Sequence, residues 1–260
     1  MTLLDDLLAD LKAEGDQLWN AVAGLDEAAW RTPTPAAGWD VATQVAHLLW
    51  TDEVATLAAT DKAGWDAVVL QAMEDPTGFV DTAALEVARL SPPALLARWG
   101  KARTALTDAL RGFPAGEKMP WFGPPMSPAS MVTARFMETW AHSLDVYEAL
   151  DCVPEPTDRI RNVAHLGVRT RGFAFTVHQL EPPTEEFRIE LKAPSGEIWT
   201  WGPEEAAQSV RGSAYDFCLL VTQRVHRDDT DLVAVGDDAE KWLTIAQAFA
   251  GPAGEGRAPR

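Results

Sequence analysis

The segment Thr133-Ala-Arg-Phe-Met-Glu-Thr-Trp-Ala-His-Ser-Leu-Asp-Val146 places an acid and an imidazole four residues apart, at Glu138 and His142. Residues i and i+4 of a helix lie on the same face, one turn apart. A carboxylate and an imidazole so placed can hold one metal ion between them. Such spacing is also common by chance, and taken alone it fits a hydrogen-bonded core histidine beside a solvated glutamate.

A third potential ligand, His47, lies far upstream in the segment Gly38-Trp-Asp-Val-Ala-Thr-Gln-Val-Ala-His-Leu48. Asp40 is a good N-cap residue, and the apolar spacing after it predicts a helix from about Val41 to Thr60. His47 falls beside the apolar stripe of that helix. Three ligands on two helices would leave coordination positions open, as in catalytic rather than structural zinc sites.

Four long helical segments predict a four-helix bundle over residues 1–150. The expected helices cover 2–23, 41–60, 92–110 with Ser91 as its cap, and the segment of Glu138 and His142, which ends near Leu150. Residues 61–90 read as helical pieces broken at Pro76-Thr-Gly78.

A linker rich in proline and acids, 151–156, separates the bundle from a small α+β domain expected at 157–250. The alternating pattern of Phe187-Arg-Ile-Glu-Leu-Lys192 predicts a strand, paired as a hairpin with Ile198–Trp201. Further strands are expected at 208–212 and 232–235, and helices at 158–179, 214–226 and 239–250. Residues 251–260 are expected to be a disordered tail.

The two histidine segments together resemble the DinB-like helical metalloproteins, and within them the actinobacterial family of mycothiol-dependent maleylpyruvate isomerase. One segment is similar to the family's Gly-Trp-(Thr/Ser)-x-x-x-x-x-x-His-Leu motif, with Asp40 at the Thr/Ser position. The other is similar to its Arg-x-x-Glu-x-x-x-His-x-x-Asp motif, from Arg135 to Asp145. The resemblance implies that His47, Glu138 and His142 bind a divalent metal, usually zinc.

The second half resembles the family's small sterol-carrier-like α/β domain, through its order of elements and the segment Ala214–Arg224. Relatives often end this helix in Gly-Arg, whereas Gln223 replaces the glycine here. The resemblance allows Arg224 to reach a thiol cofactor or substrate, and a helix-end cation is the alternative. Some relatives suggest wyosine-base formation for this region, which the acidic charge argues against.

Two further residues are catalytic candidates beside Arg224. Arg135 lies one turn before Glu138 and could orient it or an anionic substrate, or form a peripheral salt bridge. Asp145, three residues after His142, could accept a hydrogen bond from a ligating histidine, or be a surface carboxylate.

The net charge of −17 excludes several classes of partner. Nucleic acid and anionic membranes would be repelled, and no segment reads as a signal peptide or a membrane span, so we expect a cytoplasmic protein. The two cysteines, Cys152 and Cys218, are too few for a disulfide framework and read as free thiols.

Three functional hypotheses remain at this point. The first is a metal-dependent isomerase or thiol transferase, in which the metal activates mycothiol for attack on an electrophilic small molecule. The second is a thiol-independent metal hydrolase or lyase. The third is a non-enzymatic protein that binds a small apolar ligand and keeps a metal site. The expected assembly is a monomer or homodimer.

Overall fold

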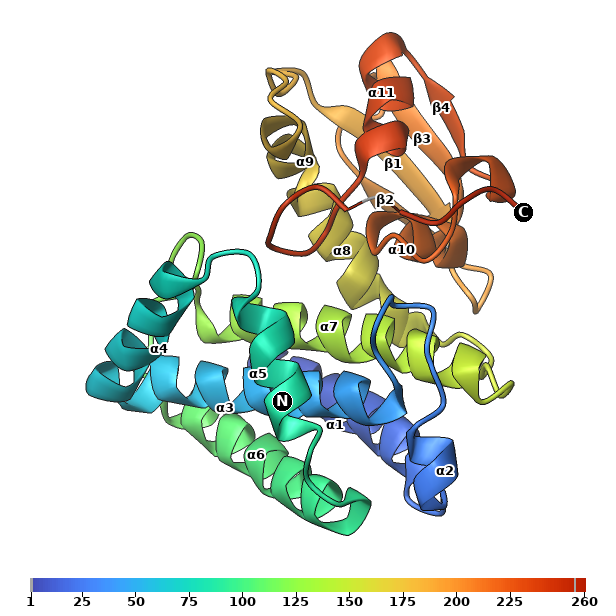
Figure 1. Cartoon of the computed structure of the whole chain (residues 1–260). Helices are drawn as coiled ribbons and strands as arrows, with labels where there is room; N and C mark the ends of the chain where they lie inside the picture. The colour runs from blue at the N-terminus through green and yellow to red at the C-terminus, as the bar shows by residue number, and fades with distance from the viewer. Residues whose placement is uncertain (1, 255) are drawn as a thin grey trace. The chain divides into compact units, whose positions relative to one another are not determined.

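The computed structural model describes residues 2–254 and 256–260, and the chain forms two compact units, Met1–Pro154 and Glu155–Arg260. The first unit is helical and the second combines helices with a small sheet (Figure 1). The predicted fold class, a helical bundle followed by a small α+β part, is therefore confirmed. Among the described residues, no helix combines the length and apolar character needed to cross a membrane.

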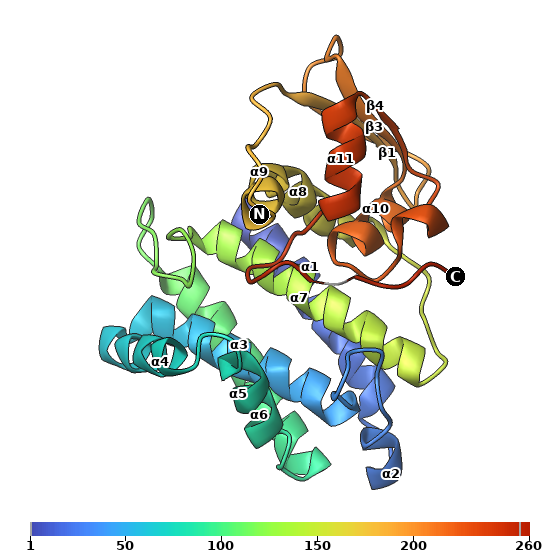
Figure 2. The same ribbon diagram turned by 45° about the horizontal axis from the view of Figure 1, so that its top comes forward.

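Four helices build the bundle of the first unit: α1 (Leu3–Val22), α3 (Val41–Thr60), α6 (Pro92–Gly112) and α7 (Pro128–Ala149). Helix α3 packs against both α6 and α7, and α1 packs against α7. Figure 2 shows the shorter helices α4 (Lys62–Glu74) and α5 (Phe79–Val87) lying against α3, and α2 (Glu27–Trp30) precedes the loop to α3. Because α3 is covered by helices on several sides, most of its residues are buried, including polar ones.

Local signals explain where these helices begin. Asp40 accepts a hydrogen bond from the Thr43 backbone N–H at 2.8 Å, and Ser127 caps α7 before Pro128. Ser91 occupies the N-cap position of α6, as expected, although its side chain makes no capping hydrogen bond. Pro92 and Pro93 occupy the first two helical positions, where a missing N–H costs no helical hydrogen bond.

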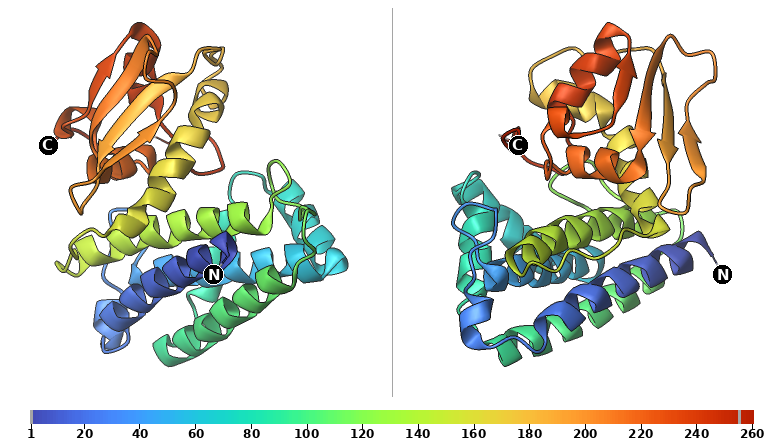
Figure 3. Two further views of the ribbon diagram at one scale, coloured as in Figure 1. Left: turned by 180° about the vertical axis from the view of Figure 1, so that it is seen from behind. Right: turned by 90° about the vertical axis from the view of Figure 1, so that its right-hand side faces the viewer.

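The second unit is built on a four-stranded sheet of order β2-β1-β3-β4. Strand β1 (Phe187–Lys192) pairs antiparallel with β2 (Ile198–Trp201) and parallel with β3 (Gln208–Ser213), and β4 (Val233–Val235) is antiparallel to β3. The alternate residues Phe187, Ile189 and Leu191 are buried. Figure 3 shows the helices gathered on one face of this sheet, which explains the alternation.

The helices of this unit are shorter than the sequence predicts. The expected helix 158–179 is divided into a 3-10 turn (Asp158–Ile160), α8 (Arg161–Arg169) and α9 (Arg171–Val177). At the break, the Thr170 hydroxyl donates to the carbonyls of Leu166 and Gly167. Helix α10 (Ala214–Val221) ends early because Gln223 has a left-handed φ of 59°, and α11 spans Asp237–Ile245.

The tail shows no helix or strand where it is described, and Glu255 lies outside the described residues. Its disorder therefore stays a prediction. A short 3-10 turn (Arg227–Asp229) completes the unit.

Candidate metal centre

Helices α3 and α7 bring His47, Glu138 and His142 together. One ligand atom of each lies within 4.8 Å of the others. The Nε2 atoms of His47 and His142 are 3.4 and 3.2 Å from the same oxygen, Oε2 of Glu138. Residues from distant parts of the chain thus converge because α3 and α7 pack side by side.

These distances fit a metal ion bound between the three side chains. A tetrahedral zinc ion with bonds of about 2.0–2.1 Å places neighbouring ligand atoms about 3.3 Å apart. The two distances to Glu138 Oε2 lie on either side of that value. Two imidazole nitrogens and one carboxylate oxygen are also a ligand set that suits zinc and leaves one position for another ligand.

A chain of hydrogen bonds fixes how His142 is protonated. Thr34 Oγ1 donates to the Trp39 carbonyl at 3.0 Å, so it accepts from Gln44 Nε2 at 2.9 Å. The amide of Gln44 therefore turns its oxygen, Oε1, toward His142 Nδ1 at 2.6 Å. An acceptor at this position requires a proton on Nδ1.

This arrangement has a direct consequence for the other ring nitrogen of His142. In the neutral ring, the proton on Nδ1 leaves Nε2 as a bare lone pair that faces the Glu138 carboxylate at 3.2 Å. Two electron-rich atoms at this distance repel each other unless a proton or a metal ion lies between them. The buried Gln44 amide therefore presents His142 in the form that a metal ligand needs.

The surroundings of His47 and Glu138 also favour the protonation states that bind a metal. Burial and the neighbouring His142 lower the pKa of His47 from 6.5 to about 4, so its imidazole is neutral at pH 7. Burial disfavours the charged form of Glu138, but the hydrogen bonds to His142 and His47 outweigh it and hold the pKa of this carboxyl well below its usual value. Neutral imidazoles and an ionised carboxylate are the states that bind metals.

His47 differs from His142 in its other nitrogen. Its Nδ1 atom is buried and has no hydrogen-bond partner among the residues that the structure describes. Metal-bound histidines usually donate this N–H to an acceptor. Among the described residues, Gln44 thus provides an acceptor for Nδ1 of His142, and Nδ1 of His47 has no such acceptor.

Tryptophan rings flank the centre. The Trp39 ring stacks on His142 with centroids 5.7 Å apart and lies 5.3 Å from the His47 ring. On another side, the Trp50 ring is 6.4 Å from His47. The side chains of Glu138 and His142 keep exposed fractions of 23% and 15%, so a small molecule can approach them.

Two of the three catalytic candidates, Arg135 and Asp145, lie buried on α7. Arg135 is buried, and its Nε donates to Asp52 Oδ1 at 2.9 Å, so its salt bridge is a core one rather than a peripheral one. Asp145 is also buried rather than at the surface. The acceptor that faces His142 Nδ1 is Gln44.

Arg224 belongs to the second unit, where its Nη1 donates to the Thr222 carbonyl at 2.6 Å. Its contact with a thiol cofactor stays a prediction.

Sequence reasoning missed Gln44, Thr34 and Trp39. Gln44 carries a signal that could have found it, because it is a polar residue one turn before His47 on a helix that is otherwise largely apolar. Thr34 and Trp39 lie in the loop before α3, whose path only the folded chain determines.

Comparison with known proteins agrees with this architecture. Two uncharacterised proteins from two strains of Mycobacterium tuberculosis are each 56% identical over 250 residues, which cover 96% of this chain and 97% of theirs. The crystal structure of the mycothiol-dependent maleylpyruvate isomerase is similar in fold, with a TM-score of 0.58 and 14% identity. The match covers 90% of this chain and 95% of the isomerase chain. A histidine-to-alanine mutant of that enzyme gives a TM-score of 0.59 at 15% identity and the same coverage.

Two family models match parts of the sequence. The model described as wyosine base formation matches residues 183–235, which hold the four strands of the sheet. The model described as the mycothiol maleylpyruvate isomerase N-terminal domain matches residues 11–147, more than half of the chain, and this range includes His47, Glu138 and His142. The chain therefore belongs to the mycothiol maleylpyruvate isomerase N-terminal domain family.

Proposed function

We propose that this chain is a metal-dependent isomerase or thiol transferase that uses a low-molecular-weight thiol of the mycothiol type. His47, Glu138 and His142 would hold a divalent ion, with zinc as the metal that suits the ligand set. When bound, such an ion lowers the pKa of a sulfur ligand, so that a thiolate is present at neutral pH for attack on an electrophilic carbon. The observation that carries the proposal is the His142 lone pair held against Glu138 by Gln44.

The residues of the chain have separate roles in this proposal. Gln44 orients His142, and the partly exposed sides of Glu138 and His142 leave room for the thiol and its target. Trp39 and Trp50 cover the flanks of the ligand cluster and limit the access of water. Low water access strengthens the interaction of a metal ion with its charged ligands.

The protein's own cysteines do not offer a competing nucleophile. Burial raises the pKa of Cys218 well above its usual value, and Cys218 lies in the second unit. Partial burial and the Asp151 charge raise the pKa of Cys152. Both thiols are thus disfavoured as thiolates at pH 7, which supports a nucleophile that is brought by a cofactor.

Metal analysis tests the ligand set. Purified wild-type protein is expected to bind one zinc ion per chain after reconstitution, and His142→Ala is expected to lose most of it. His178→Ala, in the second unit, is the matched control and should keep the wild-type content. Full zinc content in His142→Ala would contradict the assignment.

Calorimetry tests the thiol. Mycothiol is expected to bind the zinc-loaded protein and to bind the chelator-treated protein at least about tenfold more weakly, because sulfur would be a metal ligand. Equal affinity with and without zinc would contradict the hypothesis that the thiol binds the metal. The hydrolase or lyase hypothesis would then remain.

A further inference from the structure

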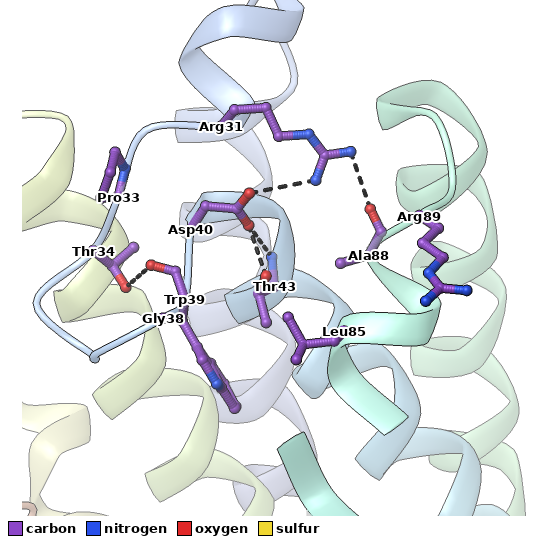
Figure 4. A pocket seen from close by; sticks show the side chains of 10 residues that line it. All are labelled: Arg31, Pro33, Thr34, Gly38, Trp39, Asp40, Thr43, Leu85, Ala88 and Arg89. Atoms are coloured by element: carbon purple, nitrogen blue, oxygen red, sulfur yellow. Dashed lines mark hydrogen bonds and ion pairs between the residues drawn. The ribbon is translucent and has the colours of Figure 1, made fainter. Parts of the chain in front are cut away.

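Two cavities differ in their relation to the metal centre. One, of about 540 Å³, opens between the loop before α3 and the end of α5, with Arg31, Trp39 and Arg89 among its walls (Figure 4). The Trp39 ring also stacks on His142, so this cavity belongs to the surroundings of the metal centre. Another, of about 870 Å³, is lined only by residues of the second unit. Its volume is within the range of sites that bind small molecules, and the proposed reaction uses none of its residues.

The cavity of the second unit lies on the face of the sheet that the described helices of this unit leave open (Figure 3). Arg188, Glu190 and Lys192 alternate with the buried residues of β1 and therefore point to this face. Across the ladder to β3, Glu190 pairs with Arg211. In the same register Lys192 pairs with Ser213. Because neighbouring strands are about 4.8 Å apart, these polar side chains share one small area of the sheet.

The acid at the centre of this area is shared between two arginines. Glu190 Oε1 accepts a hydrogen bond from Arg188 Nε at 3.0 Å, and Glu190 Oε2 lies 2.7 Å from Arg211 Nε. Arg188 also donates from Nη1 to the Gly202 carbonyl at 3.0 Å, which holds its guanidinium in place. Both carboxylate oxygens are therefore occupied, and the three side chains together keep one net positive charge.

The remaining donors of this area are available to a ligand. Lys192 is exposed and makes no hydrogen bond or ion pair with any residue that the structure describes. The Nη atoms of Arg211 likewise donate to no described residue, and its side chain is 62% exposed. Ser213 Oγ accepts from the backbone N–H groups of Tyr215 and Asp216, which leaves its own proton to donate. An ammonium, a guanidinium and a hydroxyl are donors that suit a phosphate group.

The lining of this cavity is more cationic than the unit around it. Three basic and two acidic residues line it, whereas residues 155–260 contain 12 basic and 17 acidic residues. The second acid of the lining, Asp231, is engaged by the backbone, because its Oδ1 accepts from the Ser213 N–H at 2.8 Å. A local excess of cations in an acidic unit favours binding of an anion.

We propose that this cavity binds a small phosphomonoester, with Lys192, Arg211 and Ser213 as donors to its phosphate. At neutral pH such a group carries about −1.5 to −2 charges, which matches the two positive charges that the three cations keep once Glu190 is neutralised. The body of the ester would lie against Ile198 and Tyr215, which line the same cavity. Ile198 is 60% exposed, so covering it removes apolar surface from water.

Calorimetry on the full chain tests the site. The protein would be treated with a chelator, because a zinc ion could itself bind phosphate. Phenyl phosphate is the probe, and it is expected to bind about tenfold or more tightly than phenol or the singly charged benzenesulfonate. Lys192→Met should weaken binding of phenyl phosphate by about tenfold or more, whereas Lys192→Arg keeps the charge and should lose less.

Lys241→Met is the matched control, because Lys241 is an exposed lysine of α11 in the same unit that does not line the cavity. Its affinity for phenyl phosphate should equal that of the wild type. The site would be overturned by absence of binding to the wild type, by equal binding of phenol or benzenesulfonate, by unchanged binding in Lys192→Met, or by an equal loss in Lys241→Met. These measurements involve neither zinc nor mycothiol, so a negative result here leaves the proposed function untouched.

Discussion

At the scale of single residues, Gln44 shapes the metal centre although it is not one of the three metal ligands. Gln44 is fully buried and joins the loop residue Thr34 to His142. Its amide determines which nitrogen of His142 carries the proton, and so which one faces Glu138. The centre therefore depends on residues in its surroundings as much as on the three ligands.

Replacing Gln44 tests this dependence. Gln44→Leu is expected to weaken zinc binding by about 10–100-fold, because the acceptor for His142 Nδ1–H is lost. Gln44→Glu keeps an acceptor of the same shape and should retain most of the affinity. Competition with a chelator of known affinity measures both, and equal loss in the two variants would show that orientation of His142 is not the cause.

Arg135 has a role in the core that its place in the sequence motif did not reveal. Burial raises the pKa of Asp52, while the Arg135 guanidinium and the Trp99 indole oppose this rise. Arg135 Nε and Trp99 Nε1 donate to the two oxygens of Asp52 at 2.9 and 3.3 Å. The pair joins α7 to α3 behind the metal ligands.

Breaking this pair should cost stability. Arg135→Met leaves Asp52 buried without its cation and is expected to lower the free energy of unfolding by about 3–5 kcal/mol. The double variant Arg135→Met with Asp52→Asn removes the unpaired charge, keeps an acceptor for Trp99 and should recover part of the loss. Urea unfolding measures the free energy of unfolding of both variants. Folded Arg135→Met should retain its zinc. Loss of zinc without loss of stability would instead favour a direct role of Arg135 at the metal.

At the scale of elements, three helices end in the same way without a glycine. Asp151, Gln179 and Gln223 have φ values of 51°, 59° and 59° after α7, α9 and α10. At each end, this residue donates to the carbonyl three positions earlier and the next residue to the carbonyl five positions earlier. These are Schellman motifs, in which glycine is the residue that adopts a positive φ with least strain.

Gln179 is the best site to test this strain, because its side chain is exposed. Gln179→Gly is expected to raise the free energy of unfolding by about 0.5–1 kcal/mol, as glycine removes the left-handed strain and loses some chain entropy. Gln179→Ala keeps a Cβ and should bring no such gain. Chemical denaturation of the three proteins is the measurement, and an equal effect of Gly and Ala would argue against strain at this position.

At the scale of the whole molecule, the buried metal centre makes stability depend on pH. Unfolded His47 takes up a proton below its ordinary pKa of 6.5, whereas folded His47 does so only near pH 4. Protons therefore favour the unfolded chain between these values, and stability falls as pH falls through this window. The lowered pKa of Glu138 adds a further loss at more acidic pH, below its unfolded value of 4.5.

The loss should be measurable in metal-free protein. It is expected to approach about 1.4 kcal/mol for each pH unit within the window and about 3 kcal/mol in total from His47. Denaturation of wild type and His47→Leu between pH 7 and pH 4 would measure it. The variant should show a flatter profile, and identical slopes would show that His47 does not titrate as its burial requires.

Many of the helices and strands can be predicted from the amino-acid sequence, because local chemistry places them. Apolar spacing and Asp40 predict the start of α3, which carries His47, and the segment of Glu138 and His142 is predicted as a helix that ends near Leu150. The alternation in Phe187–Lys192 predicts β1 in the same way. Helical and strand periods are properties of neighbouring residues, so they can be read along the chain.

The surroundings of the three metal ligands depend on how the folded chain packs. This packing brings Gln44 and Thr34 to His142, commits Arg135 to Asp52, and leaves Arg89 at a cavity beside Trp39. These relations join residues far apart in sequence, and they depend on how helices pack and how the loop before α3 runs. No local period encodes such contacts, because burial and hydrogen-bond geometry arise only when the elements meet.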